Sequence, residues 1–232
     1  MPMSFIKRKI LDLYRYNVQP RVEALHAEQI FQGIFQDQCR QRGIDEPFYP
    51  VGAAAGYSLM YLLVRALSEL PIKDVLELGS GQTTILIDRL RGMEGTHVTY
   101  EQSELWAASV SRRAPRCQLI HSPLVERSSK GVTHRGFEQL IPTDFDLLLV
   151  DGPNGTDHAS RYDCVQLVEA NRKSEFIIIV DDADRPGERE TLQSLADVLR
   201  RRGIDFKLNY VSGRTTQAVI TTPGMRAASY FF

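Results

Sequence analysis

The chain has 232 residues, of which 43% are hydrophobic and 25% charged, a composition typical of one soluble domain with a full core. Its 28 basic and 29 acidic residues leave a net charge of −1, which gives no general attraction to nucleic acid or to an anionic membrane. Three widely spaced cysteines form neither a CxxC pair nor a zinc pattern. We therefore expect a cytoplasmic protein with reduced thiols that binds no nucleic acid and no membrane.

The first 50 residues predict a helical extension. Apolar residues recur at helical spacing over residues 4–43, in two stretches that Pro20 separates. The sequence "RGIDEPFYP" (42–50) then ends the pattern with a glycine and two prolines. These amphipathic helices favour packing on the domain or a homodimer contact, and residues 51–232 are expected to form the main domain.

After a further helix that ends before Pro71, the pattern predicts a parallel sheet. Short apolar runs alternate with helical stretches, which is typical of βαβ units. The last two runs, 206–211 and 216–222, are joined by only four residues and must therefore form an antiparallel hairpin. The sequence thus predicts an α/β, Rossmann-like doubly wound sheet with a reversed last strand. The five earlier runs are 74–78, 97–100, 117–120, 145–150 and 176–180.

A glycine-rich turn follows the first strand. In "VLELGSGQTT" (75–84) the strand ends at Leu78, and the glycines would let the backbone approach a ligand closely. Glu101 lies 20 residues beyond Gly81, directly after the second strand, where a carboxylate can accept hydrogen bonds from ribose hydroxyls. A dinucleotide motif would need a glycine at position 84, where this chain has a threonine, so an NAD-dependent oxidoreductase is disfavoured.

Glu77 lies two residues before the first glycine, and the resulting acidic-x-Gly-x-Gly sequence resembles the first motif of class I S-adenosylmethionine-dependent methyltransferases. The resemblance covers roughly residues 50–222, although many members have a third glycine where this chain has Thr83. It implies the strand order 3-2-1-4-5-7-6, S-adenosylmethionine as the cofactor, and a lid formed by the N-terminal region. Glu77 would lie near the methionine amino group or anchor the turn, and Glu101 would hold the ribose. The implied cofactor contacts are Glu77, Gly79, Ser80, Gly81, Glu101, Gln102, His121, Ser122 and Asp151.

Acidic residues follow two neighbouring strands of the predicted sheet. Asp151 ends the fourth strand, and Asp181 and Asp182 end the fifth. Because neighbouring strands lie about 4.8 Å apart, these carboxylates should converge at one edge of the sheet. Two carboxylates about 4 Å apart repel by roughly 4 kcal/mol at an effective dielectric constant of 20, so the cluster needs a cation, a proton or a ligand. Oxygen ligands suit magnesium, manganese or calcium, whereas Arg161 or Arg185 could also neutralise one carboxylate.

This layout resembles the metal-dependent O-methyltransferases of the catechol and macrolide-sugar kind. The resemblance implies that Asp151, Asp181 and Asp182 ligate a magnesium ion (or manganese or calcium) that holds a hydroxyl of a small-molecule or sugar acceptor. The Gly152-Pro153 sequence after Asp151, with the later Arg161, resembles a looser methyltransferase group that includes plant enzymes methylating glucuronic acid on xylan. A metal-free catalytic site and a structural ion-pair network both stay open as alternatives.

The sequence therefore predicts an S-adenosylmethionine-dependent O-methyltransferase, assisted by a divalent metal. Asp151 and His158 are the candidate catalytic residues, since His158 lies seven residues past Asp151 in the following loop. The alternatives are a metal-independent methyltransferase that uses Asp151 or His158 as the base, or a non-catalytic cofactor-binding module. Trp106 is expected to pack in the core on a helix face rather than to stack on adenine.

Overall fold

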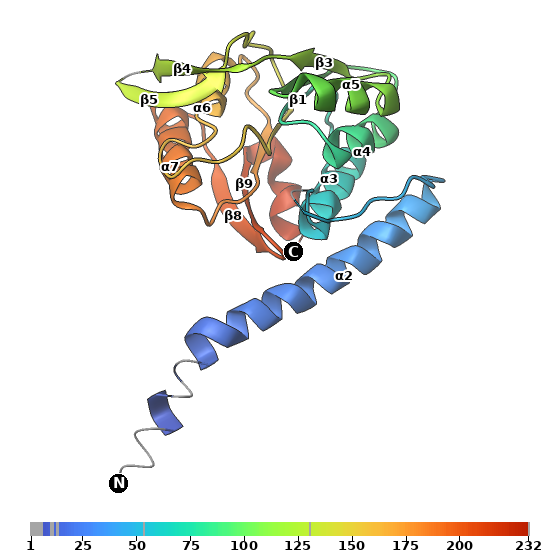
Figure 1. Cartoon of the computed structure of the whole chain (residues 1–232), viewed down its shortest axis with the longest axis vertical. Coiled ribbons are helices and arrows are strands. Elements are labelled where there is room, and N and C mark those ends of the chain that lie inside the picture. The colour runs from blue at the N-terminus through green and yellow to red at the C-terminus, as the bar shows by residue number, and fades with distance from the viewer. Residues whose placement is uncertain (1–6, 10–11, 13, 53, 130, 232) are drawn as a thin grey trace.

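A seven-stranded sheet with helices on both faces forms the centre of the computed structural model, which describes residues 7–9, 12, 14–52, 54–129 and 131–231 (Figure 1). The strand order is β3-β2-β1-β6-β7-β9-β8, which confirms the predicted order 3-2-1-4-5-7-6 once strands outside this sheet are left uncounted. The strands are β1 (Val75–Leu78), β2 (His97–Glu101), β3 (Gln118–His121), β6 (Leu147–Val150), β7 (Ile177–Val180), β8 (Lys207–Ser212) and β9 (Thr216–Thr221).

The central strands β6 and β7 are apolar throughout because both faces of the sheet are covered. Successive residues of a strand point to opposite faces, so Leu147 and Leu149 enter one core while Leu148 and Val150 enter the other. The first core packs against α3 (Tyr57–Glu69), α4 (Gln82–Leu90), α5 (Glu104–Arg113) and the 3-10 helix η2 (Pro223–Tyr230). The second packs against α6 (Asp163–Ala170) and α7 (Pro186–Arg201).

The predicted reversed strand is confirmed, because β9 pairs antiparallel with both β7 and β8. A second, unpredicted ribbon consists of β4 (Leu124–Ser129) and β5 (Val132–Phe137), which pair antiparallel in the connection between β3 and β6. This ribbon is mostly polar, so it contains no apolar run from which its strands could be predicted. Its position depends on buried Asp163, whose carboxylate accepts a hydrogen bond from the Phe137 amide (2.7 Å) and contacts His134 (3.3 Å).

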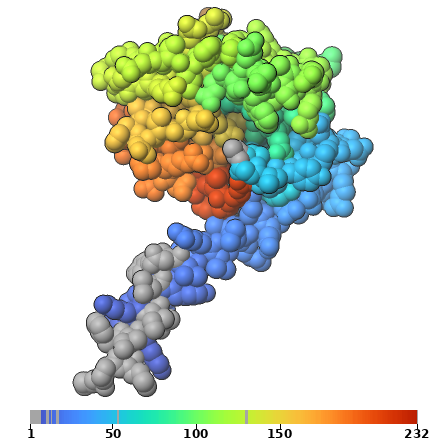
Figure 2. All heavy atoms as spheres, in the orientation of Figure 1, coloured from blue at the N-terminus to red at the C-terminus, as the bar shows by residue number. Residues whose placement is uncertain are grey.

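The N-terminal extension contains a long helix, α2 (Gln19–Gln41), with Pro20 in its first turn and the short π-helix η1 (Tyr14–Val18) before it. Part of the predicted 4–43 helix lies outside the described residues. Phe35 and Cys39 are buried, while the start of α2 stands clear of the rest of the molecule (Figure 2). None of the helices in the described residues is both long and apolar enough to cross a membrane.

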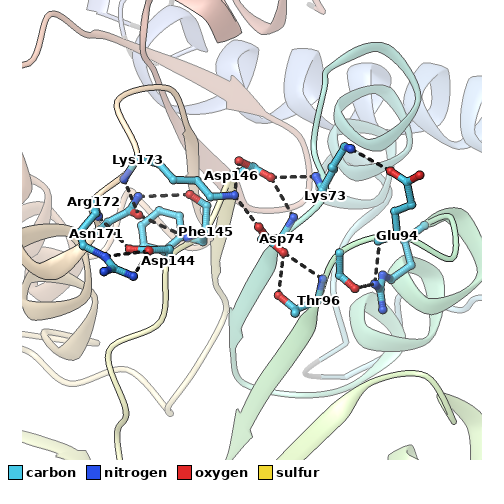
Figure 3. Close-up of polar contacts among 12 residues, drawn as sticks. Lys73, Asp74, Glu94, Thr96, Asp144, Phe145, Asp146, Asn171, Arg172 and Lys173 are labelled. Carbon is cyan, nitrogen blue, oxygen red and sulfur yellow. Dashed lines mark hydrogen bonds and ion pairs between the residues drawn. The ribbon is translucent and has the colours of Figure 1, made fainter.

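An ion-pair cluster joins β1 and β6 at the amino ends of the strands (Figure 3). The Lys173 ammonium donates to Asp74 (2.5 Å) and to Asp146 (2.7 Å). The second oxygen of Asp146 accepts the backbone amides of Lys73 and Asp74, both at 2.8 Å. This cluster fixes the end of the sheet that lies opposite the glycine turn.

Candidate active site

A cavity of about 660 Å³ opens at the carboxyl ends of β1, β2 and β6. It brings together six of the nine predicted cofactor contacts. Its remaining wall comes from the segment after α2, the starts of α4 and α5, and the loop after β6. The six are Gly79, Ser80, Gly81, Glu101, Gln102 and Asp151. The other lining residues are Tyr49, Val51, Ala54, Ala55, Gln82, Thr83, Ser103, Trp106, Pro153 and Asn154.

The glycine turn packs backbone against backbone on the loop after β6. Gly79 has a φ of 88°, and a Cβ atom there would lie 2.8 Å from the Cα of Gly152. Only glycine fits such a conformation and such a contact without strain. Gly81 has extended backbone, and a Cβ there would approach only Trp106, at 4.0 Å. The contact between Gly79 and Gly152 therefore couples the shape of the turn to the loop that carries Asp151.

Glu77 anchors the turn from below and does not line the cavity. Its buried carboxylate accepts hydrogen bonds from the hydroxyls of Thr83 (2.6 Å), Thr84 (2.8 Å) and Thr99 (2.7 Å). Thr83 stands at the position where many class I methyltransferases have a third glycine. Its hydrogen bond to Glu77 fixes the orientation of its side chain. Of the two roles predicted for Glu77, the geometry favours the anchor.

Glu101 faces the cavity while it also holds the turn. Its carboxylate accepts hydrogen bonds from the amide and hydroxyl of Ser80 (2.9 and 2.8 Å) and from the amide of Ser103 (2.8 Å). A carboxylate has about four acceptor positions, so these donors leave at least one for a ligand.

Trp106 forms part of the cavity wall, and the expectation that it packs in the core is wrong. It is 51% exposed, and its indole nitrogen donates to the carbonyl of Ser80 (2.7 Å). The buried residues of α5 are Ala107 and Val110, so the core-facing side of the helix begins one position after Trp106. The helical period, rather than residue type, decides its direction.

Residues 49–52, 54 and 55 cover one side of the cavity, across the predicted domain boundary at residue 50. The Tyr49 amide donates to the side chain of Gln82 (2.6 Å), whose own amide donates back to the Tyr49 carbonyl. The Arg214 guanidinium, from the turn between β8 and β9, donates to the carbonyls of Pro50 and Gly52. The cover is thus this connecting segment, fixed at two places, rather than a helix of the extension.

The three strand-end aspartates converge as expected. One carboxylate oxygen from each of Asp151, Asp181 and Asp182 lies within 4.8 Å of the others. Neighbouring residues of a strand would point apart, but β7 ends at Val180 and Asp182 has a φ of 59°. This left-handed turn directs the Asp182 carboxylate back towards Asp151.

Two arginines compensate part of the negative charge. The buried Arg161 guanidinium lies 2.9 Å from Asp182 and 3.9 Å from Asp151, and Arg185 lies 2.9 Å from the same oxygen of Asp182. Glu188 is also buried and lies 3.6 Å from Arg161. Four carboxylates therefore face two guanidinium groups. Burial, followed by the charge of Asp181, raises the pKa of Asp151 well above its usual value, and Arg161 offsets this only in part.

The residues present fit a divalent cation. One oxygen of Asp181 accepts from Thr215 (2.8 Å) and Gln217 (2.7 Å), and one oxygen of Asp182 accepts from the two arginines. The other oxygen of each aspartate receives no hydrogen bond from a described residue. Carboxylate oxygens are the ligands that magnesium, manganese and calcium prefer, so Asp151, Asp181 and Asp182 would be the residues to hold such an ion.

Besides Glu77, five predicted site residues lie outside the cavity lining: Asp181 and Asp182 of the acidic cluster, and His121, Ser122 and His158. The His158 side chain is 84% exposed and pairs with Glu190 on α7 (3.0 Å), so its position gives no support to a role as the base. His121 is exposed at the end of β3. Ser122 is buried, and its hydroxyl accepts the Gln139 amide (2.8 Å).

Sequence reasoning missed several residues that build the site. In the sequence, Arg161 is recognisable only as a possible partner for one carboxylate and by its position after the Gly152-Pro153 sequence. Nothing in the sequence points to Thr215 and Gln217, because they reach Asp181 only through the antiparallel pairing of the reversed strand. Gln82 and Arg214, which hold the cover, are likewise recognisable only from the tertiary structure.

No protein-family profile matches the chain, and no curated protein matches it. Solved structures do. The O-methyltransferase TomG from Streptomyces achromogenes, involved in tomaymycin synthesis and solved with S-adenosylmethionine, has a TM-score of 0.55 at 15% identity over 87% of this chain and 98% of its own.

The O-methyltransferase from Bacillus cereus, solved with S-adenosylhomocysteine, has a TM-score of 0.53 at 13% identity over 87% of this chain and 100% of its own. The precorrin-6y C5,15-methyltransferase from Geobacter metallireducens has a TM-score of 0.51 at 13% identity over 74% of this chain and 91% of its own. At this level of identity the similarity concerns the fold. The chain has the class I S-adenosylmethionine-dependent methyltransferase fold, preceded by a helical N-terminal extension.

Proposed function

We propose that this protein is an S-adenosylmethionine-dependent O-methyltransferase that acts on a hydroxyl of a small molecule or sugar. One observation carries the proposal: a single cavity contains the glycine turn, a carboxylate with a free acceptor position at Glu101, and Asp151. Two proteins of the same fold were solved with S-adenosylmethionine or S-adenosylhomocysteine, which supports a cofactor of this class.

Each part of the cavity suits one part of the reaction. When bound, S-adenosylmethionine supplies the methyl group, which passes in line from sulfur to the acceptor oxygen. The turn 79–81 approaches the cofactor through its backbone, and the remaining acceptor position of Glu101 takes a ribose hydroxyl. The Asp151 carboxyl is 21% exposed and accepts the proton that the acceptor hydroxyl loses. The cover formed by residues 49–52, 54 and 55 limits the access of water.

The strand-end cluster supports assistance by a divalent metal. Asp151, Asp181 and Asp182 would hold magnesium, manganese or calcium, and the ion would stabilise the acceptor oxygen as an alkoxide. The excess of two carboxylates over guanidinium groups supports this assignment. The metal-independent alternative is supported by Arg161, which already places a positive charge 2.9 Å from Asp182.

Calorimetry with S-adenosylhomocysteine and with NAD tests the cofactor assignment. We expect 1:1 binding of S-adenosylhomocysteine and none of NAD; the reverse result would reject the proposal. Release of S-adenosylhomocysteine from S-adenosylmethionine is then measured against a panel of hydroxylated small molecules and sugars, with magnesium or with EDTA. Loss of turnover in EDTA supports the metal, and undiminished turnover supports the metal-independent alternative. Cofactor binding without turnover of any acceptor would favour the non-catalytic module. The homodimer and the cytoplasmic location stay predictions.

A further inference from the structure

Arg161 joins the two loops that follow β6 and β7. Its guanidinium donates to the carbonyls of Pro153 (3.1 Å), Val150 (3.4 Å) and Asp181 (2.9 Å), and to the carboxylate of Asp182 (2.9 Å). The side chain is 4% exposed. An arginine has five donors in a rigid planar fork, so it can hold several acceptors in one fixed arrangement.

The backbone around Arg161 is in an unfavourable conformation that its contacts must maintain. Arg161 and Asp182 have φ values of 56° and 59°, in the left-handed region that costs energy for residues other than glycine. These two strained residues are also the two partners of the 2.9 Å ion pair. The loops after β6 and β7 therefore keep their shape together, and the Arg161 side chain is the link between them.

Arg161 reaches the cofactor cavity through other residues, because it does not line the cavity itself. Its acceptor Pro153 and the nearby Asp151 do line it. Gly152 lies between them and packs directly on Gly79 of the glycine turn. A displacement of Pro153 would therefore be passed to the turn through backbone atoms alone, which cannot absorb it by changing rotamer.

We propose that Arg161 is a positioning residue for cofactor binding: it holds the loop 150–153 against the acidic turn 181–182 and so sets the shape of the glycine turn. This inference rests on the proposed function. Charge alone does not account for it, because Arg185 contacts the same oxygen of Asp182 at the same 2.9 Å. Arg185 is 51% exposed and donates no hydrogen bond to the described residues 150–153.

Arg185 therefore provides a matched control with the same change of charge. We compare the full-length wild type with Arg161→Met, Arg161→Lys and Arg185→Met, using S-adenosylhomocysteine as the probe in calorimetry and thermal unfolding as the measure of folding. We expect Arg161→Met to weaken S-adenosylhomocysteine binding roughly tenfold or more, because small displacements of positioning groups are costly. Arg185→Met should stay within about threefold of the wild type, as a change outside the cavity. Arg161→Lys should fall between them, since an ammonium keeps the charge but cannot span both loops.

Each outcome has a definite meaning. A lower melting temperature of Arg161→Met with unchanged affinity would show a purely structural role and overturn the inference. Equal weakening by Arg161→Met and Arg185→Met would assign the effect to charge and also overturn it. If Arg161→Met does not fold, Arg161→Lys decides, and wild-type affinity in that variant rejects the inference. If the wild type itself does not bind S-adenosylhomocysteine, the proposed function fails, and this result is distinct from the other three.

Discussion

At Glu101 a single carboxylate has two tasks, since it holds Ser80 and Ser103 and also faces the cavity. Hydrogen bonds to a charged acceptor are worth about 1.5–3 kcal/mol each, more than those to a neutral one. A ligand hydroxyl at the remaining acceptor position would therefore gain much of its affinity from the negative charge of this residue.

Glu101→Gln keeps the size of the side chain and removes its charge. We expect the affinity for S-adenosylhomocysteine in calorimetry to fall about 10- to 100-fold, which corresponds to the loss of one charge-assisted hydrogen bond. Glu104→Gln, an equal change of charge at an exposed position of α5 outside the cavity lining, is the control. Equal affinities of the two variants would contradict the role given to Glu101.

The two glycines of the turn are predicted to differ in their tolerance of alanine. Gly79→Ala forces a Cβ to within 2.8 Å of Gly152 at a φ of 88°, and we expect it to lower the free energy of unfolding by at least about 2 kcal/mol. Position 81 has extended backbone and free space around a Cβ atom, so Gly81→Ala should change the free energy of unfolding of the protein by less than about 1 kcal/mol. Urea titration measures both, and similar losses would show that the contact with Gly152 is not what requires glycine.

Sequence spacing was sufficient for residues whose position follows from a strand end. Asp151, Asp181 and Glu101 each come directly after or at the end of a buried strand, and parallel strands bring such residues to one edge. The orientation of Arg161 was not predictable in this way, because it depends on left-handed backbone at two residues that are not glycines. The prediction therefore found the acids and missed the residue that links their loops.

At the scale of elements, the strands of the sheet were predictable from the sequence and the β4–β5 ribbon was not. Apolar runs predicted all seven strands of the sheet, most clearly β6 and β7, which are buried on both faces. The ribbon of β4 and β5 is mostly polar and carries no such run, although buried Phe137 and the Asp163 carboxylate on α6 both hold it in place. Hydrophobic periodicity predicts strands that are buried in the core, but it does not predict a mostly polar strand pair whose position depends on polar contacts.

The ion-pair cluster at the amino ends of β1 and β6 gives a pH-dependent prediction. Partial burial alone would raise the pKa of Asp74, but hydrogen bonds from Lys173 and Thr96 outweigh it and hold the pKa below its ordinary value of 3.8. A carboxyl whose pKa is lowered by folding stabilises the fold above its unfolded pKa, and this contribution is lost as the pH falls through the folded value.

Lys173→Met should lower the free energy of unfolding by about 1–2 kcal/mol at pH 7, because it leaves two partly buried carboxylates without their cation. Urea titrations from pH 7 to pH 3 should show the difference from the wild type shrinking below about pH 4, as Asp74 becomes protonated. Lys73→Met, which removes an exposed pair with Glu94, should leave the free energy of unfolding nearly unchanged. A difference that stays constant with pH would contradict this account of Asp74.

On the scale of the whole molecule, α2 has two halves with different surroundings. Val22 and Leu25 are more than half exposed, whereas Phe31 stacks on Tyr61 and Phe35 packs against Phe48. Between the halves, the carboxylate of Glu28 accepts backbone amides from the start of α3 and from the turn between β8 and β9. The attachment of the extension therefore begins at Glu28.

Two shortened chains test this division. A chain without residues 1–24 should lose less than about 1 kcal/mol of unfolding free energy, since the described residues of that stretch lie on the exposed half. A chain without residues 1–45 loses Glu28 and two packed phenylalanines, and we expect it to be less stable by several kcal/mol, at about 1.5–3 kcal/mol for each buried aromatic side chain. Thermal and urea unfolding of both chains measure the difference; equal stabilities would show that Glu28 and the helix after it contribute nothing to stability.

The cover of the cavity is held largely by hydrogen bonds to its backbone. The Gln82 side chain bonds the amide and carbonyl of Tyr49, and the Arg214 guanidinium donates to the carbonyls of Pro50 and Gly52. Every amino acid carries those carbonyls. The side chains of Tyr49 and Val51 can consequently be replaced by those of other amino acids without loss of these hydrogen bonds, although both side chains line the cavity. If the proposed function holds, point changes at these two positions would alter the preference for the acceptor with no compensating change elsewhere.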